Sequence, residues 1–312
     1  MTVHLIEVGP RDGLQLESKQ LSVDERYQLV IKLSQAGLQE IEVGAMVSPR
    51  AVPQMANSQA LASRLAQNLS ANWTVLVPNE RGLQAAIDAG VRRVAVFTSA
   101  SETFNQHNIR CSIQQSIDRF KPVISLAKRH KISVRGYVSC AVHCPFESWI
   151  APEAVYKVSH QLTELGCDQI SLGETTGRGS VVHIKQLLRH LLHSHGSLNA
   201  SHFACHFHDT YGQALANVFA ALDAGIQTFD TSIAGLGGCP YSPGASGNLA
   251  TEDLVYALQA QGELGHIDLG ALTTISQWIC MLLGRVIDAK STQAIVASAA
   301  LAKPDSPPGC AD

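Results

Sequence analysis

One pattern recurs along this chain: a run with helical periodicity ends in glycine, and a short run typical of a β-strand follows. The four clearest copies are residues 33–37 before 41–44, 86–90 before 94–97, 162–166 before 170–173, and 221–225 before 228–231. Glycine has no β-carbon, so it can adopt the left-handed backbone conformation that ends a helix and returns the chain to a sheet. The pattern therefore predicts repeated βα units.

Four further strand-like runs lie near residues 3–8, 73–77, 132–138 and 202–207, which brings the expected strands to eight. Strands that alternate with helices favour a parallel sheet, and eight such units most simply close into a (β/α)8 barrel, the TIM barrel. An open, doubly wound sheet is the alternative. However, no Gly-x-Gly-x-x-Gly sequence follows the first strand, as it does in dinucleotide-binding sheets of that kind.

The length of the chain suits one such domain followed by a tail. The chain has 312 residues, of which 46% are hydrophobic, enough to bury one large core. We expect a single catalytic barrel over residues 1–300. Residues 303–309 are rich in proline, serine and glycine and bury too little apolar surface to fold alone. The sequence therefore predicts a flexible, disordered tail over residues 301–312, which contains Cys310.

Charge and cysteine spacing exclude several classes of partner. The formal net charge is −3 and no long basic run occurs, so we expect no nucleic-acid partner. No apolar run is long enough to span a bilayer, and the N-terminus lacks the features of a secretory signal. None of the eight cysteines forms a Cys-x-x-Cys pair. We expect a cytoplasmic protein with reduced thiols and no membrane partner.

Charged residues follow the first two expected strands. Arg11 and Asp12 lie in a turn rich in proline and glycine after the first strand, and Glu42 lies near the end of the second. Active sites of α/β barrels form at the C-terminal ends of the strands. These residues are therefore candidates for catalysis, although a salt-bridged surface loop would give the same pattern at Arg11 and Asp12.

His206 and His208 close the seventh expected strand. Residues two apart on a strand face the same side, so both imidazoles can reach one ion; two core histidines are the alternative. A loop rich in glycine, proline and serine follows the eighth strand at residues 233–253 and contains Cys239 and Asn248. A cysteine taken alone is more often a small buried hydrophobe, but a glycine-rich barrel loop favours a functional thiol.

Four of these residues together offer two imidazole nitrogens and two oxygens: Asp12, His206, His208 and Asn248. This set leaves room for water or substrate and suits Mg²⁺ or Mn²⁺. A closed structural zinc site would contain more thiolate ligands. The sequence therefore predicts a divalent cation at the catalytic face.

Several long motifs resemble those of the 3-hydroxy-3-methylglutaryl-CoA lyases, a family of metal-dependent lyase barrels. They occur in order at residues 8–15 (VGPRDGLQ), 47–55 (VSP and VPQM), 133–140 (SVRGYVSC), 208–217 (HDTYGQALAN) and 235–253. The resemblance covers nearly all of residues 4–260. It supports the barrel expected from the strand pattern.

This resemblance implies retro-Claisen cleavage of 3-hydroxy-3-methylglutaryl-CoA to acetyl-CoA and acetoacetate. It implies that the four residues named above bind the cation, and that Arg11 stabilises the enolate that leaves. Cys239 corresponds to the catalytic thiol of the family, which protonates the enolate carbon, and Glu42 corresponds to an acidic residue that orients Arg11 or the substrate. Either His206 or a water molecule would accept the proton of the hydroxyl.

One motif departs from the family pattern. The family has Ser-Leu-Gly-Asp-Thr after the sixth strand, whereas this chain has Glu174 in place of the aspartate. We expect Glu174 to contact substrate, and its extra methylene leaves open a related 3-hydroxy-acyl-CoA with a longer C3 substituent, or a 4-hydroxy-2-oxoacid. An inactive barrel retained for binding is a further alternative.

The biological setting stays open. We expect a homo-oligomer, a dimer or larger, acting on an acyl-CoA thioester. The metabolic pathway also stays open: it is either leucine breakdown, with its link to ketone bodies, or another route that uses acyl-CoA thioesters.

Overall fold

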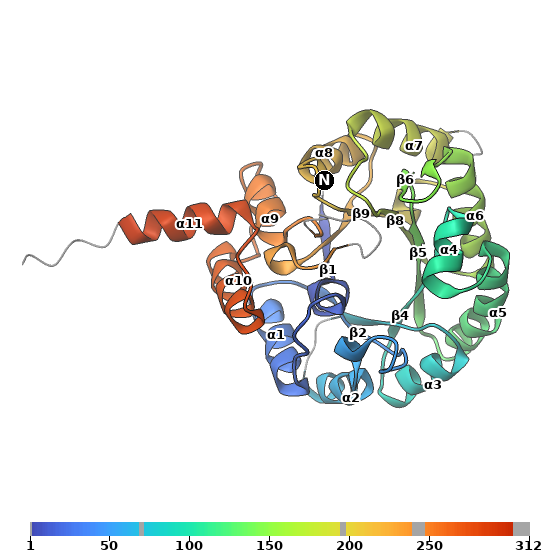
Figure 1. Cartoon of the computed structure of the whole chain (residues 1–312), viewed down its shortest axis with the longest axis horizontal. Helices are drawn as coiled ribbons and strands as arrows, with labels where there is room; N and C mark the ends of the chain where they lie inside the picture. Colours follow the sequence, from blue (N-terminus) through green and yellow to red (C-terminus); the bar gives the residue numbers. More distant parts are fainter. Residues whose placement is uncertain (1, 69–71, 194–197, 239–246, 302–312) are drawn as a thin grey trace, which may run out of the picture.

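A computed structural model describes the chain at residues 2–68, 72–193, 198–238 and 247–301. Eight strands close into a barrel in the order β1-β10-β9-β8-β5-β4-β3-β2, and all neighbouring pairs run parallel. The barrel strands are β1 (His4–Glu7), β2 (Glu40–Ala45), β3 (Asn72–Leu76), β4 (Arg93–Ser99), β5 (Ser133–Ser139), β8 (Gln169–Glu174), β9 (Phe203–Phe207) and β10 (Thr228–Thr231). The predicted (β/α)8 barrel is confirmed (Figure 1).

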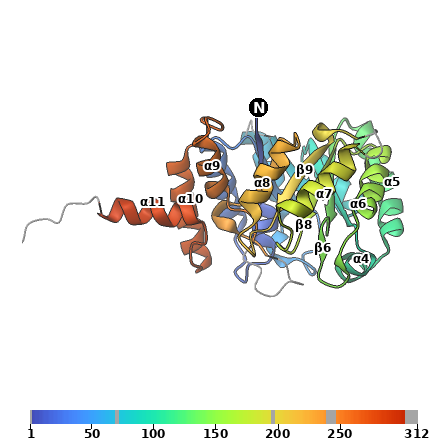
Figure 2. The same cartoon turned by 90° about the horizontal axis from the view of Figure 1, so that it is seen from above.

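Helices surround the barrel, and α11 projects away from it (Figures 1 and 2). The α-helices are α1 (Val23–Gln35), α2 (Ser58–Asn68), α3 (Glu80–Asp88), α4 (Glu102–Ile109), α5 (Ile113–Arg129), α6 (Pro152–Leu165), α7 (Val181–His193), α8 (Ala214–Asp223), α9 (Thr251–Gln259), α10 (Leu269–Leu283) and α11 (Lys290–Leu301). Short helical turns lie at Pro53–Met55, Ala200–His202 and Ile233–Gly235. No helix among the described residues is both long and apolar enough to cross a membrane.

The glycine that ends each copy of the sequence repeat adopts the expected backbone conformation. Gly37, Gly90, Gly166 and Gly225 have φ angles of 101°, 77°, 105° and 91°. At Gly37 a β-carbon would lie 2.5 Å from the backbone oxygen of His266. The repeat therefore reflects a steric requirement where the chain leaves a helix and turns toward the next strand.

One continuous apolar core joins the strands to the surrounding helices. Leu29 and Leu33 of α1, Leu83 of α3 and Phe120 of α5 are fully buried or nearly so. Burial of each such side chain contributes about 1.5–3 kcal/mol relative to exposure. The core fixes the strands, so their C-terminal ends form a rigid platform for the loops that follow them.

Two elements were not predicted from the sequence. A two-stranded antiparallel hairpin, β6 (His143–Cys144) and β7 (Ser148–Trp149), follows β5. A short π-helix at Gly9–Gly13 follows β1 and carries Arg11 and Asp12. The predicted tail, including Cys310, lies outside the described residues from 302 onward, so the boundary of the barrel near residue 300 stays a prediction.

We expect Gly37→Ala to destabilise the protein through a clash in addition to backbone strain. A left-handed residue with a β-carbon costs about 1–2 kcal/mol, and overpacking against the His266 carbonyl adds about 1–3 kcal/mol. Gly284→Ala is the matched control, because Gly284 has a φ of 71° but nothing within 4 Å of the position that a β-carbon would take. Urea denaturation should give a larger loss for Gly37→Ala; equal losses would show that the clash contributes nothing.

Candidate active site at the C-terminal ends of the strands

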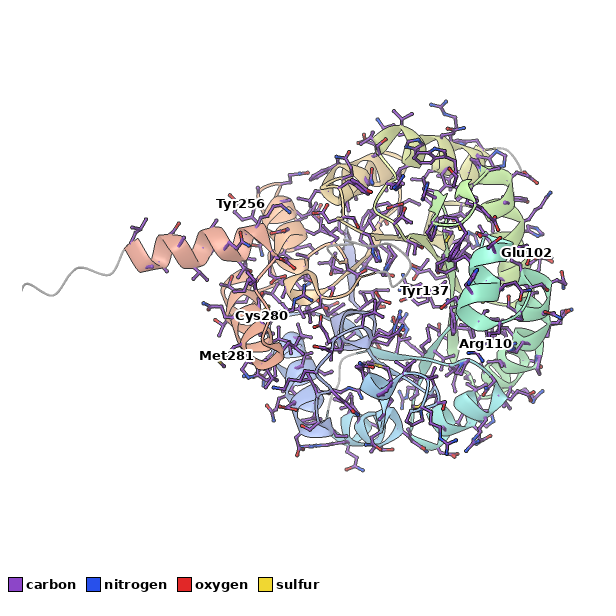
Figure 3. The ribbon with its side chains drawn as sticks, in the orientation of Figure 1. Glu102, Arg110, Tyr137, Tyr256, Cys280 and Met281 are labelled. Atoms are coloured by element: carbon purple, nitrogen blue, oxygen red, sulfur yellow. The ribbon has the colours of Figure 1, made fainter. Side chains whose placement is uncertain are left out.

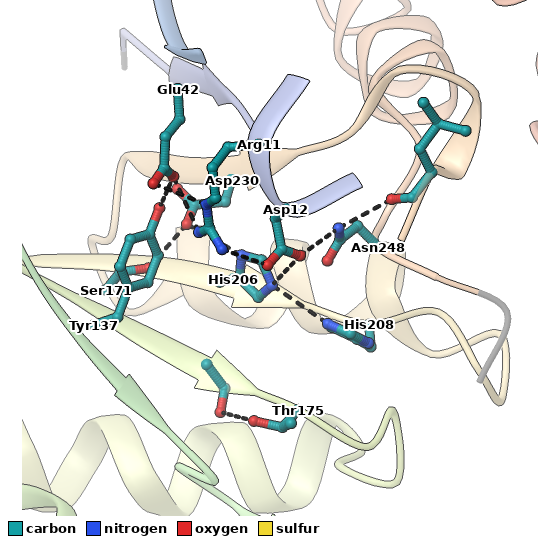
Figure 4. Close-up of polar contacts among 12 residues, drawn as sticks. Arg11, Asp12, Glu42, Tyr137, Ser171, Thr175, His206, His208, Asp230 and Asn248 are labelled. Atoms are coloured by element: carbon teal, nitrogen blue, oxygen red, sulfur yellow. Dashed lines mark hydrogen bonds and ion pairs between the residues drawn. The ribbon is translucent and has the colours of Figure 1, made fainter. Parts of the chain in front are cut away.

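Asp12, His206 and His208 converge at the C-terminal mouth of the barrel (Figure 4). One ligand atom from each lies within 4.8 Å of the other two. The Nε2 atom of His206 is 3.3 Å from Nε2 of His208 and 3.9 Å from Oδ2 of Asp12. The structure thus brings together three of the four residues predicted as cation ligands, in a geometry that one ion could bridge.

Asn248 joins this cluster through its amide. Its Nδ2 atom donates to Oδ2 of Asp12 at 2.9 Å and to the backbone oxygen of Leu236 at 3.0 Å. The amide oxygen is buried and has no hydrogen-bond partner. The amide nitrogen, rather than the oxygen, now faces Asp12. Asn248 would therefore bind a cation through its oxygen after a flip of the side-chain amide, which exchanges the two atoms.

The protonation states of the cluster suit a cation. Burial, with the neighbouring His206, lowers the pKa of His208 to about 4, so its imidazole is neutral at neutral pH. Burial alone would raise the pKa of Asp12, but Arg11 and the two histidines lower it to about 2. Burial alone would lower the pKa of His206, but the hydrogen bond to Asp230 and the charge of Asp12 raise it, so a cation would have to compete with a proton there. A partly buried carboxylate beside two imidazoles is still a donor set that binds divalent metals, and Nδ1 of His208 is buried without a partner.

Arg11 is held by two carboxylates. Its Nε and Nη2 atoms donate to the two oxygens of Glu42 at 2.9 and 3.1 Å, and Nη1 donates to Oδ1 of Asp12 at 2.7 Å. The hydroxyl of Tyr137 donates to Glu42 at 2.6 Å. A bidentate arginine–carboxylate pair fixes orientation as well as charge. This pairing would let Glu42 orient Arg11, one of the two roles that the resemblance implies for it.

Asp230 was missed by the sequence analysis, yet it contacts a predicted ligand directly. Its Oδ2 atom accepts hydrogen bonds from Nδ1 of His206 at 3.2 Å and from Oγ of Ser171 at 2.9 Å, while Oδ1 accepts one from Arg135 at 2.7 Å. A carboxylate on Nδ1 leaves Nε2 of His206 available to a metal. The sequence signal was an aspartate inside a strand, where aspartate is rare.

Glu7 ties together the segments that carry the site. Its buried carboxylate accepts hydrogen bonds from the backbone nitrogens of Gly9 and Ile233 at 2.7 and 2.9 Å, and from Oγ1 of Thr251 at 2.6 Å. Gly9 begins the π-helix that carries Arg11 and Asp12. The first βα loop is therefore fixed relative to the segment after β10.

Glu174 lies at the end of β8 but does not line the cavity that contains Arg11. Its carboxylate accepts a hydrogen bond from Oγ1 of Thr176 at 3.1 Å, and its side chain packs beside Gly179. Burial raises its pKa. The structure therefore turns Glu174 toward the loop after β8 rather than toward the predicted ligands, and the expected contact with substrate has no support in this geometry.

A cavity of about 320 Å³ opens beside the cluster. Arg11, Asp12, His206 and His208 line its polar end. The remaining wall is largely apolar and includes Val47, Val52, Leu76, Phe97 and Phe104. Gly238 also lines the cavity; Cys239, the predicted catalytic thiol, is the next residue and lies outside the described residues.

The model of the HMGL-like family matches residues 2–279. The chain belongs to the HMGL-like family. Among its relatives, the hydroxymethylglutaryl-CoA lyase of Pseudomonas mevalonii is 50% identical, over 96% of this chain and 98% of that protein. The 3-hydroxy-3-isohexenylglutaryl-CoA/hydroxymethylglutaryl-CoA lyase of Pseudomonas aeruginosa is 44% identical, over 95% of this chain and 98% of that protein. The family predicted from the sequence motifs is confirmed.

Solved structures agree with this assignment to the HMGL-like family. The hydroxymethylglutaryl-CoA lyase of Pseudomonas aeruginosa superposes with a TM-score of 0.91 at 44% identity, covering 95% of this chain and 98% of that one. A lyase of Acinetobacter baumannii in complex with coenzyme A and 3-methylmalate superposes with a TM-score of 0.87 at 32% identity, covering 100% of this chain and 98% of that one. The likeness therefore extends over the whole barrel of this HMGL-like chain.

We expect Asp230→Asn to weaken divalent cation binding by about 10- to 100-fold, the usual effect of losing the partner of a metal-binding histidine. Asp168→Asn is the matched control, because Asp168 is half-exposed and pairs with Lys128. Isothermal titration with Mn²⁺ should separate the two variants. Unchanged affinity in a folded Asp230→Asn protein would remove Asp230 from any role in orienting His206.

Proposed function

We propose that this chain cleaves 3-hydroxy-3-methylglutaryl-CoA to acetyl-CoA and acetoacetate with the help of a divalent cation, Mg²⁺ or Mn²⁺. The main observation in favour is the convergence of a fixed guanidinium with a carboxylate and two imidazoles at one end of a cavity. The lyase relatives support the same reaction. Asp12, His206, His208 and Asn248 would hold the cation.

When bound, the cation would polarise the C3 hydroxyl of the substrate as a Lewis acid and make its proton easier to remove. After that proton leaves, the C2–C3 bond breaks and the departing fragment is a thioester enolate. The enolate oxygen needs a fixed positive charge. Arg11 has five N–H donors, of which Glu42 and Asp12 take three, so one N–H on each terminal nitrogen can reach the enolate oxygen.

His206 has two proposed roles that compete for the same atom. Its Nδ1 is bonded to Asp230, and its Nε2 is the atom nearest to His208 and Asp12. One nitrogen cannot bind a cation and accept a proton at the same time. We therefore assign His206 to the cation and leave proton acceptance to a water molecule, the alternative given by the sequence.

Cys239 is proposed as the acid that protonates the enolate carbon, on the basis of the family motif. The preceding Gly238 lines the cavity, and Asn248, soon after the segment that contains Cys239, contacts Asp12. Both flanks of that segment therefore reach the site, which supports a role for its thiol there.

A related substrate with a longer C3 substituent is the second candidate. The apolar wall of the cavity, formed by Val47, Val52, Leu76, Phe97 and Phe104, could pack against a hydrocarbon group. The relative from Pseudomonas aeruginosa is named for both 3-hydroxy-3-isohexenylglutaryl-CoA and hydroxymethylglutaryl-CoA. We therefore propose that the cavity sets the length of substituent that this chain accepts.

We further propose that the chain forms homo-oligomers through the surface around α11. α11 extends beyond the barrel (Figure 1), and Leu301 at its end is 89% exposed. Tyr256 and Met281, labelled in Figure 3, are exposed large side chains of the neighbouring helices α9 and α10. A second copy could cover these apolar groups.

A cytoplasmic location is also proposed. Relatives named as cytoplasmic lyases include that of Danio rerio, at 46% identity over 94% of this chain, whereas that of Bos taurus is named mitochondrial.

The first test is product formation by protein stripped of metal. We expect acetyl-CoA release from 3-hydroxy-3-methylglutaryl-CoA only after Mg²⁺ or Mn²⁺ is added, because the Lewis acid is then available. The same assay with 3-hydroxy-3-isohexenylglutaryl-CoA as substrate tests the second candidate. Release that is unaffected by chelator would contradict the cation; no release from either thioester, in protein that binds Mn²⁺, would contradict the substrate class.

Arg11→Gln should lower kcat by about 10²–10³-fold, since removal of a donor to the developing charge has an effect of this size. Arg64→Gln is the control, because Arg64 pairs with Asp24 on the surface and its loss should leave kcat unchanged. Steady-state rates with both variants, at saturating cation, measure the difference. A normal kcat in Arg11→Gln would show that a group other than Arg11 stabilises the enolate oxygen.

A further inference from the structure

Two cysteines form a small cluster away from the proposed cation ligands. Cys140 follows β5, and Cys144 ends β6 of the hairpin. Both are fully buried and form, with Phe104 of α4, a cluster separate from the main core. Neither is in a disulfide, and the function proposed above uses neither thiol.

Several donors point at the sulfur of Cys144. The hydroxyl of Ser101 is 3.1 Å from it, and the backbone nitrogen of Phe146 donates to it at 3.3 Å. Ser101 already accepts a hydrogen bond from the backbone nitrogen of Phe104, so its own proton is left for one of two acceptors, the sulfur or the carboxylate of Glu147. A thiol surrounded by donors is stabilised as the thiolate.

The position of Cys144 in the fold adds to this effect. Ser101 is the N-cap of α4, and the N-terminus of a helix carries a partial positive charge that favours thiolates. The carboxylate of Glu147 also binds this helix end, where it accepts a hydrogen bond from the backbone nitrogen of Thr103, and its negative charge offsets part of this effect. The hydrogen bond from the Cys140 side chain, with those of Ser101 and Phe146, lowers the pKa of Cys144 to about 5.

Three other buried cysteines contrast with Cys144. Burial raises the pKa of Cys167 to about 12 and that of Cys280 to about 11, and it raises that of Cys205 further. A thiolate with a second thiol bonded to it has the two components of a redox pair: a nucleophile and a resolving group.

We propose that Cys140 and Cys144 are a redox-active dithiol that hydroperoxides oxidise to an intramolecular disulfide. The Cys144 thiolate attacks one oxygen of the hydroperoxide, the O–O bond breaks, and the other oxygen leaves with a proton as water or alcohol. Cys144 is then a sulfenic acid. The Cys140 thiol attacks its sulfur and loses a proton, the S–O bond breaks, and water leaves. Two electrons pass from the two thiols to the peroxide.

The oxidant would reach the sulfurs by opening of the hairpin above them. β6 and β7 are two residues each, and Phe146 in the turn between them is 42% exposed. Short elements with few backbone hydrogen bonds open locally far more often than the whole protein unfolds. Burial therefore slows the oxidation of Cys144 without preventing it.

Oxidation would reach the cavity through two contacts. Phe104, which belongs to the same cluster as both cysteines, lines the cavity wall. The backbone nitrogen of Cys140 donates to Oγ1 of Thr175 at 2.9 Å, and Thr175 also lines the cavity. Formation of a disulfide draws the sulfurs closer than a hydrogen bond allows, so the wall beside Phe104 must shift. We expect a higher KM for the thioester with a smaller change in kcat.

Peptide mass spectrometry after peroxide treatment tests the dithiol directly. Reduced full-length protein is treated with hydrogen peroxide and alkylated in denaturant, and each cysteine is scored. We expect a linked peptide that contains Cys140 and Cys144 and has lost two hydrogens, and dithiothreitol should restore both thiols. Both cysteines still alkylated, while Cys239 is oxidised, would overturn the proposal. The measurement requires no activity, so it is independent of the proposed function.

Single variants separate the two roles. In Cys140→Ser, Cys144 should stop at the sulfenic acid and be labelled by dimedone, whereas in Cys144→Ser, Cys140 should resist peroxide. Cys144→Ala replaces the second variant if it does not fold, and Cys280→Ser is the matched control in which the linked peptide should still form. A dimedone adduct on Cys140 in the Cys144 variants would overturn the assignment of Cys144 as nucleophile.

A kinetic comparison tests the connection to the cavity. After mild oxidation, KM should rise severalfold in the unmodified chain but not in Cys144→Ala. Because both proteins keep Cys239, any loss of activity that both show is attributed to oxidation of Cys239. A KM that rises equally in both proteins would show that the dithiol does not affect the cavity.

Discussion

The buried carboxylate of Glu7 is the contact on which the geometry of the site depends. It joins Gly9, at the start of the loop that carries Arg11 and Asp12, to Ile233 and Thr251, on either side of the segment that carries Asn248. None of its three partners is a cation. Burial therefore raises its pKa to about 7, although each hydrogen bond opposes the shift. Closure of the barrel brings β1 beside β10. The hydrogen bonds of Glu7 then hold the loop after β1 in a fixed position relative to the segment after β10.

Two buried ion pairs lie at and below the site, inside a barrel of a kind that branched apolar residues usually fill. Arg11 and Arg135 each pair with a buried carboxylate, Glu42 and Asp230, and Tyr137 lies between the two arginines. Buried ion pairs seldom add net stability, because desolvation offsets their attraction. Their value here is orientation: Glu42 directs Arg11, and Asp230 directs His206.

The features that could be predicted from the sequence are those set by neighbouring residues or by position at the end of a strand. Glycines after helices, the alternation of strands and helices, and the His206–His208 spacing each follow from the chain nearby. Contacts between distant strands could not be read in this way: Arg135 meets Asp230 only because the barrel closes. Glu174 shows a second limit, since its direction depends on the backbone of the loop after β8 rather than on its place at a strand end. The hairpin β6–β7 is too short to produce a periodic signal.

Chemistry and substrate selection are placed on different parts of the barrel. Arg11 and Asp12 follow β1, His206 and His208 lie at the end of β9, and Asn248 lies after β10. The apolar wall instead comes from the loop after β2, from β3 and β4, and from α4. Ionic contacts hold the first group, and apolar packing holds the second. A change in the wall can therefore alter which thioester fits without moving a ligand. Since Phe104 belongs to this wall and to the same small cluster as Cys140 and Cys144, a thiol reaction there would act on substrate fit and leave the residues that handle the enolate in place.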